Sequence, residues 1–133
     1  MNENSSLAIV RRILVVEDDG EVLRAVSHML NYLGHAVTEC GHAEEAFRLV
    51  QAEPFDLLLI DYRMPEMTGL DLIVMLRQEG CNVPVIMMTG YPATEERVTA
   101  QNLGVFAILK KPITPEQLSS AMAEIFNKAT VES

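Results

Sequence analysis

The sequence predicts an α/β fold in which a strand and a helix alternate five times, giving a doubly wound (βα)5 sandwich. Short apolar runs, each about the length of a buried strand, alternate along the chain with segments whose apolar residues recur at helical spacing. Four of these runs are apolar on both faces, which is typical of a parallel sheet covered by helices on each side. The 133 residues suffice for one domain, which we place at residues 11–128, between an N-terminal tail (1–10) and a C-terminal tail (129–133).

Each apolar run predicts one strand. The second strand, which follows Gly34, has the weakest pattern. Pro84 falls at the beginning of its strand, where a missing backbone donor is tolerated. The predicted strands are Ile13–Val16, His35–Cys40, Leu57–Ile60, Val83–Met88 and Val105–Leu109.

Helical spacing predicts the segments between the strands. The first helix places its apolar residues on one stripe and ends at Gly34, a residue that commonly terminates helices. Thr114-Pro-Glu-Gln117 is a capping box with proline at the first helical position, so it opens the last helix. The predicted helices are Glu21–Leu33, Ala43–Ala52, Leu70–Gln78, Thr94–Asn102 and a last one from Thr114 to about Asn127.

The composition narrows the class of protein. Nineteen acidic against ten basic residues give a net charge of −9, whereas direct nucleic-acid binding needs a basic face that neutralises phosphates. No stretch reaches the roughly 18 apolar residues of a membrane span, and the first ten residues lack the basic start of a signal peptide. We therefore expect a cytoplasmic protein that contacts no membrane and does not bind nucleic acid directly.

Polar side chains follow four of the five predicted strands. Because the carboxyl ends of parallel strands lie at one edge of the sheet, where such folds bind ligands, these side chains converge there. Each group alone is weak evidence for a functional site, since acidic turns and Lys-Pro pairs are common. All four groups at the carboxyl ends of strands in one fold are specific evidence for one. The residues that follow these strands are Glu17, Asp18 and Asp19 after the first, Asp61, Tyr62 and Arg63 after the third, Thr89 and Gly90 after the fourth, and Lys110, Lys111 and Pro112 after the fifth. Acids from two strands, a hydroxyl from a third and an ammonium from a fourth thus converge.

The combination indicates phosphoryl chemistry. Carboxylates crowded at one edge repel one another, and a hard divalent cation held by oxygen ligands relieves that repulsion. Mg²⁺ fits because it takes one or two carboxylates and leaves positions for waters and phosphate oxygens. A lysine ammonium and a threonine hydroxyl would bind the oxygens of a phosphoryl group. A carboxylate beside a metal ion and a lysine is the arrangement that phosphoryl transfer to aspartate requires.

The chain resembles a response-regulator receiver domain of two-component signalling over about residues 11–128. The resemblance implies a flavodoxin-like fold whose five-stranded parallel sheet has the order 2-1-3-4-5. The residues that carry it are Ile13-Leu-Val-Val-Glu-Asp-Asp19, Asp56-Leu-Leu-Leu-Ile-Asp61-Tyr-Arg-Met-Pro65, Met67-Thr-Gly69, Met88-Thr89-Gly90 and Lys111-Pro112.

The resemblance also implies roles for the acidic residues. Asp61 would be the phosphoacceptor, attacking the phosphorus of a phosphohistidine on a sensor histidine kinase or a histidine phosphotransfer protein. Asp18 would ligate Mg²⁺ directly, and Glu17 would do so directly or through a water. The backbone carbonyl of Arg63 would complete the protein ligands, while Asp19 would cap a helix or be exposed.

Two further residues would hold the phosphoryl group. The resemblance implies that Thr89 binds a phosphoryl oxygen and that Lys111 pairs with it. Strand alternation predicts that Lys110 points to the other side of the sheet. The Lys111-Pro112 peptide bond is often cis in this family.

The sequence departs from the family pattern at Ile108, where a tyrosine or phenylalanine commonly couples the phosphoryl group to the output face. Phe106, two residues earlier, is predicted on the same side of the strand. Arg63 and Tyr91 occupy positions that vary in the family, and their bulk predicts a phosphorylated form that outlasts that of Arg63→Asn.

Three functional hypotheses follow. The first is a phosphoacceptor signalling domain, not otherwise an enzyme, that switches a downstream partner through the face of the fourth helix, fifth strand and fifth helix. The second is a degenerate receiver that only binds proteins, with Ile108 in its favour. The third is a small Mg²⁺-dependent phosphohydrolase; no second aspartate lies two places beyond Asp61, and no inserted cap encloses a substrate.

Overall fold

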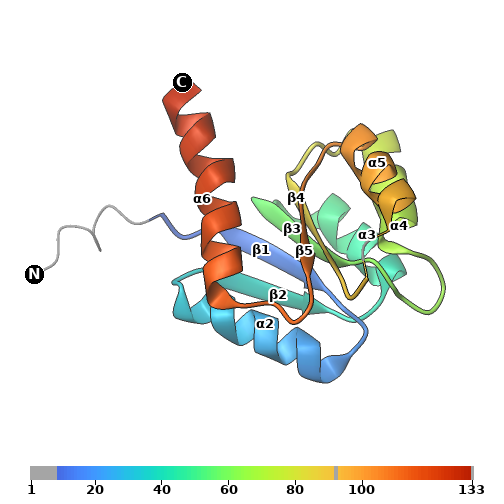
Figure 1. The fold of residues 1–133 in the computed structure, drawn as a ribbon, viewed down its shortest axis with the longest axis horizontal. Helices are drawn as coiled ribbons and strands as arrows, with labels where there is room; N and C mark the ends of the chain where they lie inside the picture. Colours follow the sequence, from blue (N-terminus) through green and yellow to red (C-terminus); the bar gives the residue numbers. More distant parts are fainter. Residues whose placement is uncertain (1–8, 92, 133) are drawn as a thin grey trace, which may run out of the picture.

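The computed structural model describes residues 9–91 and 93–132, which form one five-stranded parallel sheet flanked by helices (Figure 1). The strand order is β2-β1-β3-β4-β5, so the predicted fold class and sheet order are confirmed. Residues 1–8 of the predicted N-terminal tail lie outside the described residues. In order, the elements are β1 (Arg12–Val16), α2 (Gly20–Tyr32), β2 (Ala36–Cys40), α3 (Ala43–Ala52), β3 (Leu57–Asp61), α4 (Gly69–Gln78), β4 (Val85–Thr89), α5 (Thr94–Asn102), β5 (Val105–Lys110) and α6 (Pro115–Glu132).

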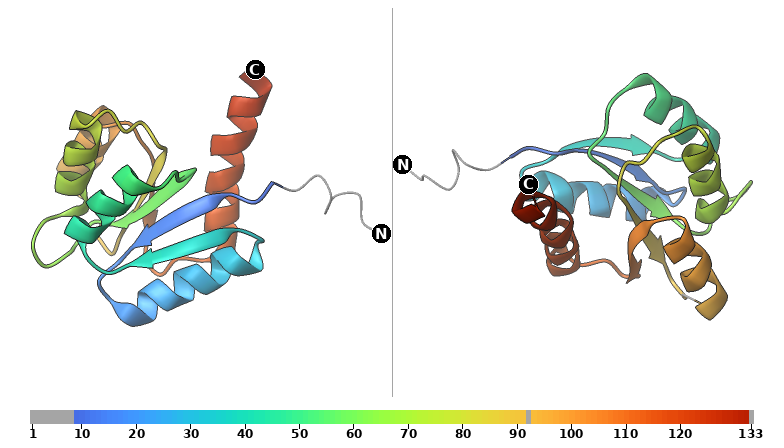
Figure 2. Two further views of the ribbon diagram at one scale, coloured as in Figure 1. Left: turned by 180° about the vertical axis from the view of Figure 1, so that it is seen from behind. Right: turned by 90° about the horizontal axis from the view of Figure 1, so that it is seen from above.

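The sheet is covered on both faces, as its two-sided apolar strands require. Alternate residues of β1 enter different cores: Leu14 and Val16 pack towards α3, α4 and α5, whereas Ile13 and Val15 pack towards α2 and α6. The right-hand view of Figure 2 shows α2 and α6 on one side of the sheet and α3 with α4 on the other. Within the described part of the chain, no helix has both the length and the apolar content needed to cross a membrane.

Local side-chain and backbone hydrogen bonds define the helix ends. Asp19 caps α2, accepting hydrogen bonds from the backbone N–H groups of Glu21 and Val22 at 3.0 and 3.3 Å. The predicted capping box of α6 is present, with Thr114 N–H donating to Gln117 Oε1 at 2.8 Å and Gln117 N–H to Thr114 Oγ1 at 3.2 Å. Gly34 ends α2 with φ +98°, a left-handed conformation that glycine adopts without strain.

Several element boundaries differ from the sequence prediction. The strand predicted from Val83 begins at Val85, because Pro84 has no N–H; its carbonyl instead accepts a hydrogen bond from Leu58 N–H at 2.9 Å. The last helix continues to Glu132 instead of ending near Asn127, through most of the predicted C-terminal tail. No glycine or proline interrupts that segment.

Phe106 does not share a side of β5 with Ile108, so that expectation was wrong. The register pairs Val85 with Val105 and Ile86 with Ala107, which leaves Phe106 as an extra residue in a β-bulge. Ile108 packs against the core beneath α3, α4 and α5, whereas Phe106 lines a groove with residues of α6. The bulge breaks the two-residue alternation on which the prediction depended.

Candidate functional site

Three carboxylates meet at the carboxyl edge of the sheet. Glu17 and Asp18 follow β1, and Asp61 is the last residue of β3. Val16 and Ile60 are paired in the β1–β3 register, so the residues that follow them lie level with each other. Carboxylate oxygens of Glu17, Asp18 and Asp61 all lie within 4.8 Å of one another. Glu17 and Asp61 are 1% and 2% exposed, so two of the three charges are buried.

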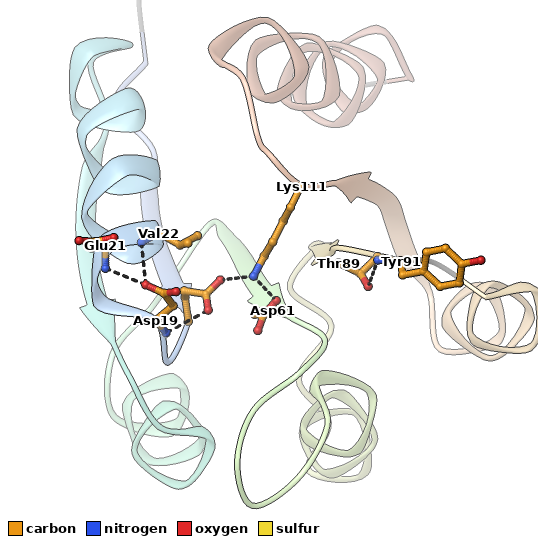
Figure 3. Close-up of polar contacts among 8 residues, drawn as sticks. Asp19, Glu21, Val22, Asp61, Thr89, Tyr91 and Lys111 are labelled. Carbon is orange, nitrogen blue, oxygen red and sulfur yellow. Dashed lines mark hydrogen bonds and ion pairs between the residues drawn. The ribbon is translucent and has the colours of Figure 1, made fainter.

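Lys111 joins the two buried carboxylates. Its Nζ lies 2.7 Å from Glu17 Oε1 and 2.8 Å from Asp61 Oδ1, as Figure 3 shows for Asp61. The Lys111 N–H donates to the Thr89 carbonyl at 2.9 Å, which fixes the chain just beyond β5, and the following Lys111-Pro112 peptide bond is cis. The adjacent Lys110 is exposed. The lysine that reaches the site is therefore Lys111.

Burial dominates the electrostatics of these groups. It raises the pKa of Glu17 and Asp61, and the hydrogen bonds from Lys111 offset only part of this effect. Burial alone would lower the pKa of Lys111, but its hydrogen bonds to the Asp61 and Glu17 carboxylates raise it. Lys111 therefore remains an ammonium beside the two acids.

Thr89 lies beside this cluster, at the end of the neighbouring strand β4 (Figure 3). Its side chain is buried, and its hydroxyl oxygen accepts a hydrogen bond from Tyr91 N–H at 3.3 Å. An oxygen that accepts in this way keeps its O–H for donation. Thr89 can thus donate to an anionic oxygen bound at Asp61.

The donor set fits a hard divalent cation. Three carboxylates and one ammonium leave a net charge of −2 if all are ionised, and carboxylate oxygens are the ligands that Mg²⁺ takes. Asp18 is exposed, whereas Glu17 and Asp61 are buried, so solvent reaches the cluster from the Asp18 side. Such a site leaves room for metal-bound water.

A comparison with protein families decides what kind of domain this is. The family described as "Response regulator receiver domain" matches residues 13–123. The chain belongs to this family. Receiver domains are components of two-component systems, so the predicted resemblance is confirmed at the level of the family and the signalling system.

Similar proteins include short and long response regulators. The receiver domain is 34% identical over 125 residues to a chemotaxis protein CheY homolog of Campylobacter jejuni, covering 91% of this chain and 96% of that protein. It is 34% identical over 113 residues to the alginate biosynthesis transcriptional regulatory protein AlgB of Pseudomonas aeruginosa; that match covers 85% of this chain but 25% of AlgB. A solved CheY-like receiver domain protein of Methanospirillum hungatei superposes with a TM-score of 0.86 at 30% identity, over 94% of this chain and 100% of that one.

Gly69 supports the receiver-domain site from behind, and sequence analysis missed this role. A Cβ added to Gly69 would lie 2.5 Å from the Asp61 carbonyl oxygen, so only glycine fits without a backbone shift. Its N–H donates to the Tyr62 carbonyl at 2.7 Å. The glycine itself was visible in the motif, but its contact with Asp61 depends on how the intervening loop folds back.

Arg63 and Tyr91 do not cover Asp61. The Arg63 guanidinium lies over the Tyr62 ring, 5.9 Å from its centroid. Tyr91 is 81% exposed and points away from Asp61 and Lys111 (Figure 3). Shielding of a phosphoryl group by these side chains remains a prediction that would require them to move.

Proposed function

We propose that this receiver domain accepts a phosphoryl group on Asp61 from a sensor histidine kinase or a histidine phosphotransfer protein. The observation that carries the proposal is the Lys111 ammonium bridging Asp61 and Glu17 beside the Asp18 carboxylate and Thr89. This edge unites a carboxylate nucleophile with a cation and a hydroxyl donor. Phosphoryl transfer depends mainly on such positioning and charge neutralisation.

In this reaction an oxygen of the Asp61 carboxylate attacks phosphorus as the bond to the donor's imidazole nitrogen breaks. The bonding pair leaves with the imidazole, and an acyl phosphate forms on Asp61. Lys111, already 2.8 Å from Asp61 Oδ1, offsets the charge on the phosphoryl oxygens. The Thr89 hydroxyl donates to one of those oxygens. The same arrangement supports slow hydrolysis of the acyl phosphate by water, without any other enzymatic activity.

Mg²⁺ is the proposed cofactor. The carboxylates of Glu17, Asp18 and Asp61 would hold it, with the backbone carbonyl of Arg63 as a further ligand. When bound, it would neutralise the negative charge that these acids and the phosphoryl group bring together. The raised pKa of buried Glu17 and Asp61 supports a need for such a counter-charge.

We place the output on the face formed by α5, β5 and α6, where exposed apolar side chains include Val98 and Phe106. A downstream protein would read this face in the cytoplasm. The relatives' names suggest two kinds of pathway to which the downstream protein could belong. One relative is a chemotaxis protein, and another is a transcriptional regulatory protein of which the matched region forms a quarter. Neither nucleic acid nor membrane is a proposed direct ligand.

The deciding experiment measures the intact protein mass after incubation with acetyl phosphate and Mg²⁺. We expect one added phosphoryl group in the wild type and in Asp56→Asn, and none in Asp61→Asn or after EDTA treatment. Asp56 is the matched control, because it lies at the opposite edge of the sheet, where its Oδ2 accepts the Arg12 N–H at 2.8 Å. A folded wild type that gains no phosphoryl group from acetyl phosphate or a phosphorylated histidine kinase would favour a receiver that only binds proteins.

A further inference from the structure

Tyr62 connects the acceptor strand to helix α5. It directly follows Asp61, and its backbone is held on both sides: its N–H donates to the Met88 carbonyl at 2.8 Å, and its carbonyl accepts from Gly69 N–H at 2.7 Å. Its ring packs partly buried against the core on the α3–α4–α5 face. A displacement of Asp61 therefore also displaces Tyr62.

The Tyr62 side chain meets Glu96 in the first turn of α5. Together with Leu70 of α4 and residues of α5, they line a groove of about 320 Å³ between the two helices. Burial raises the pKa of Tyr62, and the neighbouring Glu96 carboxylate raises it further. Glu96 Oε1 also accepts the Ala93 N–H at 3.3 Å, so the carboxylate that meets Tyr62 also caps the helix.

The attachment of α5 is uneven along its length. Its C-terminal end is held by Arg77 of α4, whose Nε donates to the Leu103 carbonyl at 2.9 Å and whose Nη1 donates to the carbonyls of Cys81 and Val83 at 2.9 Å each. Between the ends, Ala100 is the buried residue of the helix. Ala93 and Glu96, at the opposite end, contact the groove that Tyr62 lines. Movement of α5 relative to α4 is thus expected at its N-terminal end.

We propose that Tyr62 is a positioning residue that transmits the state of Asp61 to the N-terminal end of α5 through Glu96. This inference rests on the proposed phosphorylation of Asp61. An acyl phosphate adds charge and volume immediately before Tyr62. The resulting shift of the tyrosine changes or breaks its contact with the Glu96 carboxylate. Ile108, which packs on the same face of the sheet, has no polar group that could form such a link.

The test is hydrogen–deuterium exchange of the amides of residues 93–102, with and without acetyl phosphate and Mg²⁺, alongside the intact mass. In the wild type, phosphorylation should change exchange in the first turn of α5. Tyr62→Phe removes only the hydroxyl, so the phosphoryl adduct should form while the exchange response falls about fivefold, the effect of losing one polar contact of about 1 kcal/mol. Glu96→Gln, which keeps an acceptor oxygen, should retain part of the response. Tyr32→Phe is the matched control, since Tyr32 is 86% exposed.

The outcomes separate this inference from the proposed function. No phosphoryl adduct on the wild type would overturn both. An adduct with an unchanged α5 response in Tyr62→Phe, or with no α5 response in the wild type, would overturn the inference alone. An adduct in every variant, with the response reduced in Tyr62→Phe and kept in Tyr32→Phe, would establish Tyr62 as the link.

Discussion

The ammonium of Lys111 lies 2.8 Å from the carboxylate of Asp61 and at the same time 2.7 Å from Glu17. One cation therefore serves two buried anions. Removing that cation would leave both carboxylates buried without compensation, which costs more than the ion pairs themselves contribute. The cluster is thus both the proposed reaction site and a point on which stability depends.

Lys111→Met should lower the free energy of unfolding at pH 7 by about 1–3 kcal/mol, because it leaves Glu17 and Asp61 without their cation. Urea unfolding of the metal-free protein, followed by circular dichroism, measures the change. Lys110→Met is the matched control: Lys110 is exposed, and its loss should change stability by no more than about 0.5 kcal/mol. Equal effects of the two substitutions would show that the Lys111 ion pairs contribute nothing.

Asp61→Asn should stabilise the metal-free protein at neutral pH. Burial raises the pKa of Asp61 above its ordinary value of 3.8, so the folded state binds a proton at this carboxyl more tightly than the unfolded chain does. Stability from this group is therefore present below about pH 3.8 and is lost as the pH rises towards the pKa of the folded state. We expect Asp61→Asn to raise the free energy of unfolding at pH 7, because the asparagine side chain brings no charge into the buried cluster.

Urea titrations of the wild type and Asp61→Asn between pH 3.5 and pH 7 check the sign of the stability difference and its dependence on pH. The advantage of the variant should shrink as the pH falls. An Asp61→Asn protein that is less stable than the wild type at pH 7 would contradict the raised pKa of Asp61.

Gly69→Ala should displace Asp61 through its backbone. Its Cβ would lie 2.5 Å from the Asp61 carbonyl oxygen, so the end of β3 or the start of α4 must move. Overpacking of this kind costs about 1–3 kcal/mol, and the displaced Asp61 should accept a phosphoryl group more slowly. Gly90→Ala is the control, because nothing lies within 4 Å of a Cβ at that position. Thermal unfolding and the rate of adduct formation should both remain near wild type in the control.

Periodicity could predict the fold, whereas contacts between distant segments could not be predicted. The apolar runs and the Thr114–Gln117 capping box depend on local sequence, and the structure has them where the pattern indicated. The bulge at Phe106 and the approach of Gly69 to Asp61 depend on how separate segments pack, and no spacing rule contains that information. The convergence of Glu17, Asp18, Asp61 and Lys111 could be predicted, because these residues lie where parallel strands end and topology brings those ends together.

Mg²⁺ should stabilise the folded protein, because a cation that binds only the folded state shifts the unfolding equilibrium towards it. At a concentration 100 times its dissociation constant, the gain in the free energy of unfolding is about 2.7 kcal/mol. Asp18→Asn should abolish most of this gain: the exposed Asp18 is one of the three clustered acids, and replacing it removes a charged ligand without disturbing the buried Lys111 pairs. Asp56→Asn should keep the full gain. Thermal unfolding with EDTA and with increasing Mg²⁺ measures these shifts, and an equal response in Asp18→Asn and the wild type would exclude Asp18 as a metal ligand.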